Sequence, residues 1–206
     1  MLPQLSWAAA DHLVTFPHDP ARARMLLDQA GYPDPDGDGP LPRFRLTMKV
    51  SNIELNRLQS TVIQQDLERV GVALDLRTYE FATLYADVIA GNFQLYTLQW
   101  IGGALADPDI LRRVFHSSQT PPGGFNRGHY RNPRVDALLE EAGVTVDPQR
   151  LRELYGEVQR IVSHDVPYIS LWHKRNVAVA QRTLTGIHLS PLADFFFLKN
   201  VARAGT

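Results

Sequence analysis

FRLTMKV (residues 44–50) and VALDLRTY (72–79) enclose the stretch of sequence that determines the fold. Both segments are rich in β-branched and aliphatic residues, which is typical of strands. Between them, apolar residues recur at helical spacing until Gly71, which favours the end of a helix. A strand, a helix and a second strand in so short a span predict a βαβ unit with two parallel strands.

The connecting helix has an expected start and an expected buried side. SNIE (51–54) has the pattern of a capping box, in which Ser51 would accept from the backbone of the first turn. The apolar residues that we expect this helix to bury are Leu55, Leu58, Val62, Ile63, Leu67 and Val70.

On the N-terminal side, DPARARMLLDQAG (19–31) predicts a helix with Asp19 as its cap and Gly31 just beyond its end. The next stretch, GYPDPDGDGP (31–40), has the alternating acids with which a calcium loop of the EF-hand type begins. With Asp34 at position 1 of that loop, position 12 is Arg45 instead of the Glu that calcium needs. Proline, aspartate and glycine are also the residues of sharp turns, and the sequence favours a turn here over a calcium site.

The rest of the chain continues to alternate between helical and extended patterns. We expect helices at 81–91, 106–115, 132–142 and 147–165, and strands at 93–100, 168–173, 176–181 and 195–201. Asp107, Asn132 and Asp147 each precede a proline and are expected to cap the helices at 106–115, 132–142 and 147–165. SSQTPPGGFNRGHY (117–130) is predicted to form a long loop. The fold class is therefore α/β, a mixed sheet with a βαβ unit and flanking helices.

Composition excludes several classes of protein. The 206 residues are 44% hydrophobic and 21% charged, with a net charge of -1, so neither nucleic acid nor an anionic membrane is an expected partner. The chain has no cysteine, which removes thiol chemistry, and no cofactor is expected. No apolar run is long enough to span a bilayer, and residues 1–20 lack the pattern of a signal peptide.

Residues with catalytic chemistry do not form a recognisable site. The seven histidines show no metal-binding spacing. Ser163, His164 and Asp165 are consecutive, but neighbours on a helix point about 100° apart and cannot form a relay. We expect His164 to lie in the last turn of its helix, where it meets the helix dipole. The sequence therefore gives no support to an enzyme.

Two positions attract attention as binding residues. Trp100 ends an expected strand, and ligands of open α/β sheets gather beyond the carboxyl ends of strands. Ile101, Gly102 and Gly103 follow, and the glycines would let a ligand approach the backbone. Asn126 lies in the glycine-rich loop and offers both donors and acceptors. The residues alone leave Trp100 equally compatible with a core position and Asn126 with a turn position.

The order of several motifs resembles one protein family. These motifs are DPARARMLLDQAGY (19–32), QDLERVGVALDL (65–76), LQWIGG (98–103) with DPD (107–109) after it, GFNRGHYRNPRVDALLEEA (124–142) and RLRELYGEVQRIVSHDVPYISL (150–171). In this order they are similar to the family 5 extracytoplasmic solute-binding proteins of peptide, nickel and related ABC importers. The resemblance covers only the C-terminal portion of such proteins, whose full chain has two lobes joined by a hinge.

The resemblance implies a domain organisation and a function. It implies a periplasmic-binding-protein-like (type II) lobe at 19–185, preceded by an inter-lobe segment at 1–18 and followed by a segment at 186–206 that returns toward the other lobe. The implied function is non-enzymatic: capture of a peptide, saccharide or similar small solute, outside the cytoplasm, for delivery to an ABC permease. The isolated lobe is also a candidate for self-association.

The resemblance also implies which residues contact the solute. Trp100, Ile101, Gly102, Gly103 and Asn126 would form this lobe's share of the pocket, with Arg127 and His129 as weaker candidates. Peptide-binding members have an aspartate three residues after the tryptophan, which pairs with the α-ammonium of the ligand, and here that residue is Gly103. The solute would then not depend on a free α-ammonium, unless the other lobe or Asp107 supplies a carboxylate.

Two other functions stay open at this point. The same lobe occurs as an effector-sensing domain of transcriptional regulators, and flanking sequence would distinguish that case. An α/β hydrolytic enzyme would need a nucleophile and base that the sequence does not bring together.

Overall fold

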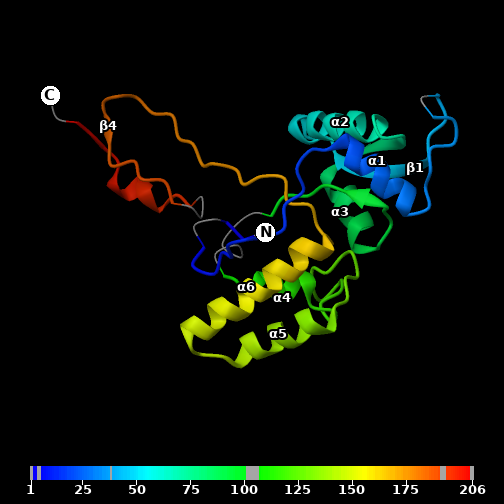
Figure 1. Cartoon of the computed structure of the whole chain (residues 1–206). Coiled ribbons are helices and arrows are strands. Elements are labelled where there is room, and N and C mark those ends of the chain that lie inside the picture. The colour runs from blue at the N-terminus through cyan, green and yellow to red at the C-terminus, as the bar shows by residue number, and fades with distance from the viewer. Residues whose placement is uncertain (1, 4–5, 38, 101–106, 191–193, 205–206) are drawn as a thin grey trace. The chain divides into compact units, whose positions relative to one another are not determined.

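The computed structural model describes residues 2–3, 6–37, 39–100, 107–190 and 194–204 and divides into two compact units (Figure 1). Unit 1 comprises residues 1–14, 100–116 and 131–206, and unit 2 comprises residues 15–99 and 117–130. Each unit is described by itself below. The domain boundaries expected at 18/19 and 185/186 concern the parent protein and stay predictions.

Unit 2 contains the parallel sheet that the sequence predicts. Strand β1 (Phe44–Ser51) pairs in parallel with β2 (Val72–Tyr79), in a register that runs from Phe44 opposite Val72 to Ser51 opposite Tyr79. The third strand, β3 (Leu95–Tyr96), pairs in parallel with the other side of β1, which gives the order β2-β1-β3. The βαβ prediction is confirmed, whereas β3 is shorter than the predicted strand at 93–100.

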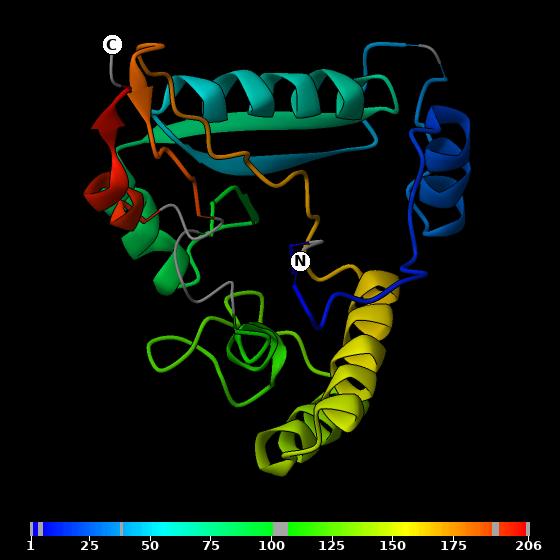
Figure 2. The ribbon, with the colours of Figure 1, turned by 90° about the vertical axis from the view of Figure 1, so that its left-hand side faces the viewer.

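Two helices cover this sheet, with α2 (Glu54–Glu68) along one face and α3 (Phe81–Ile89) on the other (Figures 1 and 2). The capping box at 51–54 is wrong. The cap residue of α2 is Ile53, which makes no side-chain cap hydrogen bond. Ser51 instead ends β1, with its Oγ accepting from Asn56 Nδ2 at 2.6 Å.

The predicted buried side of α2 is half correct. Ile63 and Leu67 pack against the sheet core of Met48, Val50 and Leu74. Leu55, Leu58 and Val62 are 48%, 60% and 57% exposed. Each residue turns a helix by about 100°, so these three lie on a different stripe from Ile63 and Leu67. The sheet covers only one apolar stripe of α2, and the sequence alone does not show which of the two stripes that is.

Helix α1 (Pro20–Gln29) and the acidic turn after it follow the prediction. Asp19 Oδ1 accepts from Arg22 N at 2.9 Å, and Gly31 has a φ of +86°. In the turn, Asp36 N donates to Asp34 Oδ1 at 3.3 Å and Leu41 N donates to Asp36 Oδ2 at 3.0 Å. Asp38 lies outside the described residues. These are the side-chain-to-backbone bonds of a turn, as predicted.

Unit 1 is built on three helices: α4 (Ile110–Phe115), α5 (Pro133–Val144) and α6 (Pro148–Asp165). The caps predicted from the Asn-Pro and Asp-Pro pairs are present, because Asn132 and Asp147 each accept from two amides of the first turn. Helices α5 and α6 lie side by side (Figure 1). Arg150 of α6 pairs with Glu141 of α5 at 2.7 Å, and Arg134 of α5 pairs with Glu157 of α6 at 2.7 Å.

The C-terminal strands differ from the prediction. Residues 168–173 and 176–181 form no strand, and 195–201 is mostly the 3-10 helix η2 (Phe196–Asn200). The regular sheet in this region is a two-residue antiparallel pair, β4 (Leu184–Thr185) with β5 (Ala202–Arg203). An extended segment becomes a strand only when a neighbour accepts its backbone hydrogen bonds. No described residue pairs with 176–181 in a sheet, and Val177 and Val179 are 80% and 96% exposed.

Across the described parts of the chain, no helix combines the length and the apolar character that a bilayer crossing needs.

Candidate functional site

We expect a ligand at the carboxyl edge of the parallel sheet in unit 2, because ligands of open α/β sheets bind beyond the carboxyl ends of the strands. Strand β1 ends there at Ser51, which is 1% exposed, and β2 ends at Tyr79. Asn52 N donates to Tyr79 O at 2.8 Å and joins the two ends. The edge is therefore rigid, and its polar groups are fixed by the backbone.

A partly buried ion pair lies at this edge. Lys49 Nζ of β1 lies 2.6 Å from Asp87 Oδ2 of α3 and 5.2 Å from the centre of the Tyr79 ring. The hydrogen bond from Lys49 lowers the pKa of the Asp87 carboxyl, against the opposing effect of burial. Because both charges are satisfied locally, this pair is structural and does not offer a charge to a ligand.

The chain leaves the sheet through Thr97 toward Trp100. Thr97 N donates to Lys49 O at 3.4 Å, and its Oγ1 is buried without a hydrogen-bond partner among the described residues. Trp100 is half-buried. Ile101, Gly102 and Gly103 lie outside the described residues. Their predicted role beside the solute stays a prediction.

Asn126 occupies the loop at 117–130, in unit 2. Asn126 is 0% exposed, and its side-chain amide makes two hydrogen bonds with the backbone of Tyr130. Asn126 Nδ2 donates to Tyr130 O at 2.8 Å, and Asn126 Oδ1 accepts from Tyr130 N at 2.9 Å. The backbone of Asn126 is fixed as well, by donation to Gln119 O at 2.8 Å. This geometry matches the turn role that the sequence left open. Its contact with a solute is untested.

Arg127 and His129, the weaker candidates, differ in their surroundings. Arg127 is 6% exposed, and its guanidinium carbon lies 5.3 Å from the ring centre of Tyr85 and 5.5 Å from that of Phe125. His129 is exposed and has a φ of +53°. These two aromatic neighbours of Arg127 could not be predicted from the sequence, because Tyr85 is far from Arg127 along the chain.

Trp100 and Asn126 belong to different compact units, and each is described only within its own unit.

In unit 1, two carboxylates precede α4. The prediction that Asp107 caps this helix is wrong, because α4 begins at Ile110 and its cap residue is Asp109, whose side chain makes no cap bond. Asp107 Oδ1 instead accepts from Asp109 N at 2.9 Å in the turn before the helix. Burial raises the pKa of the Asp109 carboxyl, Arg112 lowers it, Asp107 raises it and Arg113 lowers it.

Tyr155 of α6 is electrostatically coupled to these acids. It is 6% exposed, and its ring meets that of Trp7 edge to face at 6.2 Å between centres. Burial, and then the negative charges of Asp109 and Asp107, raise the pKa of the Tyr155 hydroxyl. The sequence identified Tyr155 only as a core position, because its contact with Trp7 joins residues far apart along the chain.

The histidines and the apparent triad take structural positions. His164 lies in the last turn of α6, as expected, and its Nδ1 is 3.1 Å from Asp165 Oδ1. Ser163 Oγ donates to Arg160 O and accepts from Val14 N, so it serves the backbone. The described residues include no cluster of three metal-ligating side chains.

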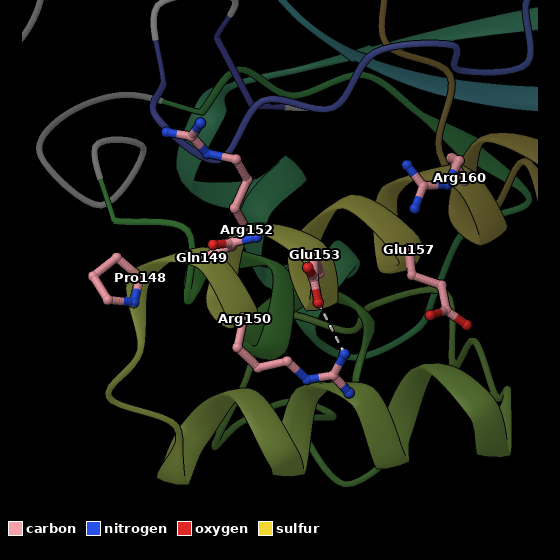
Figure 3. A pocket seen from close by; sticks show the side chains of 7 residues that line it. All are labelled: Pro148, Gln149, Arg150, Arg152, Glu153, Glu157 and Arg160. Carbon is pink, nitrogen blue, oxygen red and sulfur yellow. Dashed lines mark hydrogen bonds and ion pairs between the residues drawn. The ribbon is translucent and has the colours of Figure 1, made fainter.

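The surface of α6 has an open hollow of about 790 Å³ (Figure 3). Its walls carry Arg150, which pairs with Glu153 at 3.2 Å, and Glu157. A second hollow of about 360 Å³, in unit 2, is walled by apolar residues of α1, α2, β1 and β2. Neither hollow contains a residue that the sequence marked for binding.

Comparison with known proteins identifies the class. A model described as "Bacterial extracellular solute-binding proteins, family 5 Middle" matches residues 1–122. The chain is 31% identical over 200 residues to the glutathione-binding protein GsiB of Salmonella typhimurium, covering 93% of this chain and 37% of that protein. It is 28% identical over 184 residues to di/tripeptide-binding protein 4 of Pseudomonas aeruginosa, covering 87% of this chain and 33% of that protein.

The fold comparison agrees. The oligopeptide-binding protein AppA from Bacillus subtilis, solved with a nonapeptide, superposes with a TM-score of 0.82 at 24% identity, covering 98% of this chain and 41% of that one. The chain belongs to the family of bacterial extracellular solute-binding proteins, family 5, and its fold is of the periplasmic-binding-protein type. It spans little more than a third of the length of the curated relatives that it matches.

Proposed function

We propose that this chain is the C-terminal ligand-binding lobe of an extracytoplasmic solute-binding protein that captures a peptide-like or other small polar solute for an ABC importer. The match to the family over residues 1–122 carries the proposal. The relatives named for glutathione and for di- and tripeptides support a peptide-like solute. A saccharide remains the second class of solute to be tested.

The mechanism is capture without chemistry. A solute held between two lobes favours the closed form, and closure presents that form to the permease. In this lobe Trp100 would supply a stacking wall, and residues 101–103 would offer backbone amides. Asn126 would hold the 126–130 loop in shape.

The experiment uses the complete two-lobed parent protein. Calorimetric titration with glutathione, a free dipeptide, a tripeptide and a small oligosaccharide would identify the solute class. We expect saturable binding of at least one peptide, weakened by Trp100→Ala. Trp172→Ala, which replaces a tryptophan that is 53% exposed, should leave that binding unchanged. A parent that binds none of these probes, or is insensitive to Trp100→Ala, would contradict the proposal or its site.

A further inference from the structure

The apolar hollow in unit 2 has no part in the proposed function. Its volume is about 360 Å³, within the range of about 300–1,000 Å³ that is usual for small-molecule sites. Phe44 and Val72, the first residues of β1 and β2, are among the eight residues that line it, and all eight are apolar. The hollow therefore lies at the amino ends of these strands, away from the carboxyl edge where we expect the solute.

Helix α1 forms one wall of this hollow without closing it. Ala23, Leu26 and Leu27 line the hollow, yet no residue of α1 is buried, and Leu26 is 49% exposed. An apolar wall that stays in contact with water is unfavourable, and the apolar part of a ligand would displace that water. The hollow is accordingly suited to an alkyl chain.

A positive charge lies at one end of the hollow. Arg24 of α1 donates from Nη2 to Arg69 O at 2.6 Å, and Arg69 directly precedes Val70, a lining residue that is 6% exposed. The partner of Arg24 is a carbonyl, and Arg24 forms no ion pair with any described residue. Its charge is therefore available to an anion, with which a guanidinium makes strong hydrogen bonds.

Arg43 provides a second and independent observation at the same end. Its side chain is 3% exposed and pairs with Asp28 through Nη1, but its Nε is buried without a hydrogen-bond partner among the described residues. A Cβ at Gly71 would lie 3.1 Å from that Nε, so the unpaired N–H is close to Gly71, which lies between the lining residues Val70 and Val72. A buried donor without an acceptor is unfavourable, and an acceptor on a ligand would satisfy it.

We propose that this hollow binds a medium-chain monocarboxylate, with its alkyl chain against the apolar walls and its carboxylate at Arg24 and Arg43. Arg24 supplies the positive charge, and Arg43 Nε supplies a further donor. An apolar hollow with a cation and an unpaired donor at one end is complementary to a molecule that has one apolar chain and one anionic head. This inference goes beyond the proposed function, because it assigns a second ligand to the other end of the sheet.

The test is a calorimetric titration of the 206-residue chain with sodium octanoate, below the concentration at which it forms micelles. Hexanoate, octylamine and acetate are the comparison probes. We expect saturable binding of octanoate and about tenfold weaker binding of hexanoate, because two fewer methylenes are buried. Octylamine, which has the same chain and the opposite charge, and acetate, which has the head alone, should not bind saturably. Backbone amide NMR shifts with octanoate should concentrate at residues 23–27, 44–46 and 67–72.

Two pairs of variants on α1 locate the site. Arg24→Gln should weaken octanoate binding by about tenfold, the effect of losing a charge-assisted hydrogen bond. Arg22→Gln removes the same charge from an exposed position on the same helix and should leave the binding unchanged. Leu27→Trp should block binding by filling the hollow. Met25→Trp, at a position that is 49% exposed and does not line the hollow, is its control.

Three results would overturn the proposal. Equal weakening by Arg24→Gln and Arg22→Gln would show only a general effect of positive charge. Binding of octylamine as tight as that of octanoate would show that the carboxylate is not recognised. Octanoate shifts at the exposed aromatic residues of 195–198 instead of at the hollow would place the ligand elsewhere on the chain. Because Arg24 is exposed, Arg24→Gln should fold even if Leu27→Trp does not.

Discussion

The side-chain amide of Asn126 holds residues 126–130 together through its oxygen and its nitrogen. The side chain is fully buried and exchanges two hydrogen bonds with the backbone of Tyr130. Asn126→Ala would remove both of these hydrogen bonds, at a cost of about 1–3 kcal/mol in the free energy of unfolding. Urea denaturation measures this. Asn52→Ala, at an exposed position, is the control, and an equal loss there would contradict the structural role.

The Lys49–Asp87 pair predicts a pH dependence. In the folded chain the pKa of Asp87 is below its ordinary value, mainly because Lys49 donates a hydrogen bond to it. The unfolded chain therefore binds the proton more readily, and the stabilisation is present above about pH 4 and lost as pH falls through the folded pKa. Asp87→Asn should lower the melting temperature at pH 7, and the difference from the natural chain should shrink toward pH 3.

The control for this pair is Asp75→Asn. Asp75 pairs with Arg45 at 3.0 Å, but both side chains are substantially exposed, 39% and 60%. Surface pairs contribute little, so this variant should change the melting temperature only slightly. A constant difference between Asp87→Asn and the natural chain from pH 7 to pH 3 would show that the carboxylate charge does not carry the effect.

At the scale of elements, the loop at 117–130 depends on one glycine. A Cβ at Gly124 would lie 2.2 Å from Gln119 O, whereas a Cβ at Gly123 would meet nothing closer than Thr120 O at 3.9 Å. Gly124→Ala must therefore move the backbone, at a cost of about 1–3 kcal/mol, the usual cost of overpacking. Gly123→Ala should be close to neutral. Thermal melts of the two variants test this prediction. Equal melting temperatures for Gly124→Ala and Gly123→Ala would contradict it, because the loop would then accommodate a Cβ at either position.

The same scale shows what local sequence can predict. The caps at Asp19, Asn132 and Asp147 were predicted because cap chemistry involves residues within one turn of each other. The parallel pairing of β1 with β2 followed from the shortness of the connection. The buried stripe of α2 was half wrong, since the sheet selects one stripe of a helix that is apolar on two.

The candidate site was predictable to a smaller extent. Trp100 was expected at the end of a strand, but β3 ends at Tyr96, and the solute contacts of Trp100 and of residues 101–103 stay a prediction. The aromatic neighbours of Arg127 could not be predicted, because Tyr85 lies far from it along the chain. The segments at 168–173 and 176–181 show the opposite case. Their alternating pattern is that of strands, but no described segment pairs with them.

At the scale of the whole molecule, the balance between folding and binding can be predicted. Both units have their own buried cores, with Val50 and Leu84 in unit 2 and Phe115 and Leu154 in unit 1. We therefore expect the 206-residue chain to fold. A good site buries about 70–90% of a small ligand, and a chain that spans 37% of its relative would provide only one wall of such a pocket. Binding by this chain should accordingly be weak.

Sedimentation velocity and calorimetry with a free dipeptide test this balance together. The exposed apolar residues at Ile169, Val177 and Val179 are suited to pairing with another strand, so we expect concentration-dependent association of the chain. Ile169→Thr with Val177→Thr and Val179→Thr should reduce that association and leave the melting temperature nearly unchanged, because these side chains bury little. The control is Val146→Thr, at 90% exposure, outside the segment. Nanomolar binding of the dipeptide by a monomer would contradict the one-wall argument, because a complete pocket would then exist within this chain.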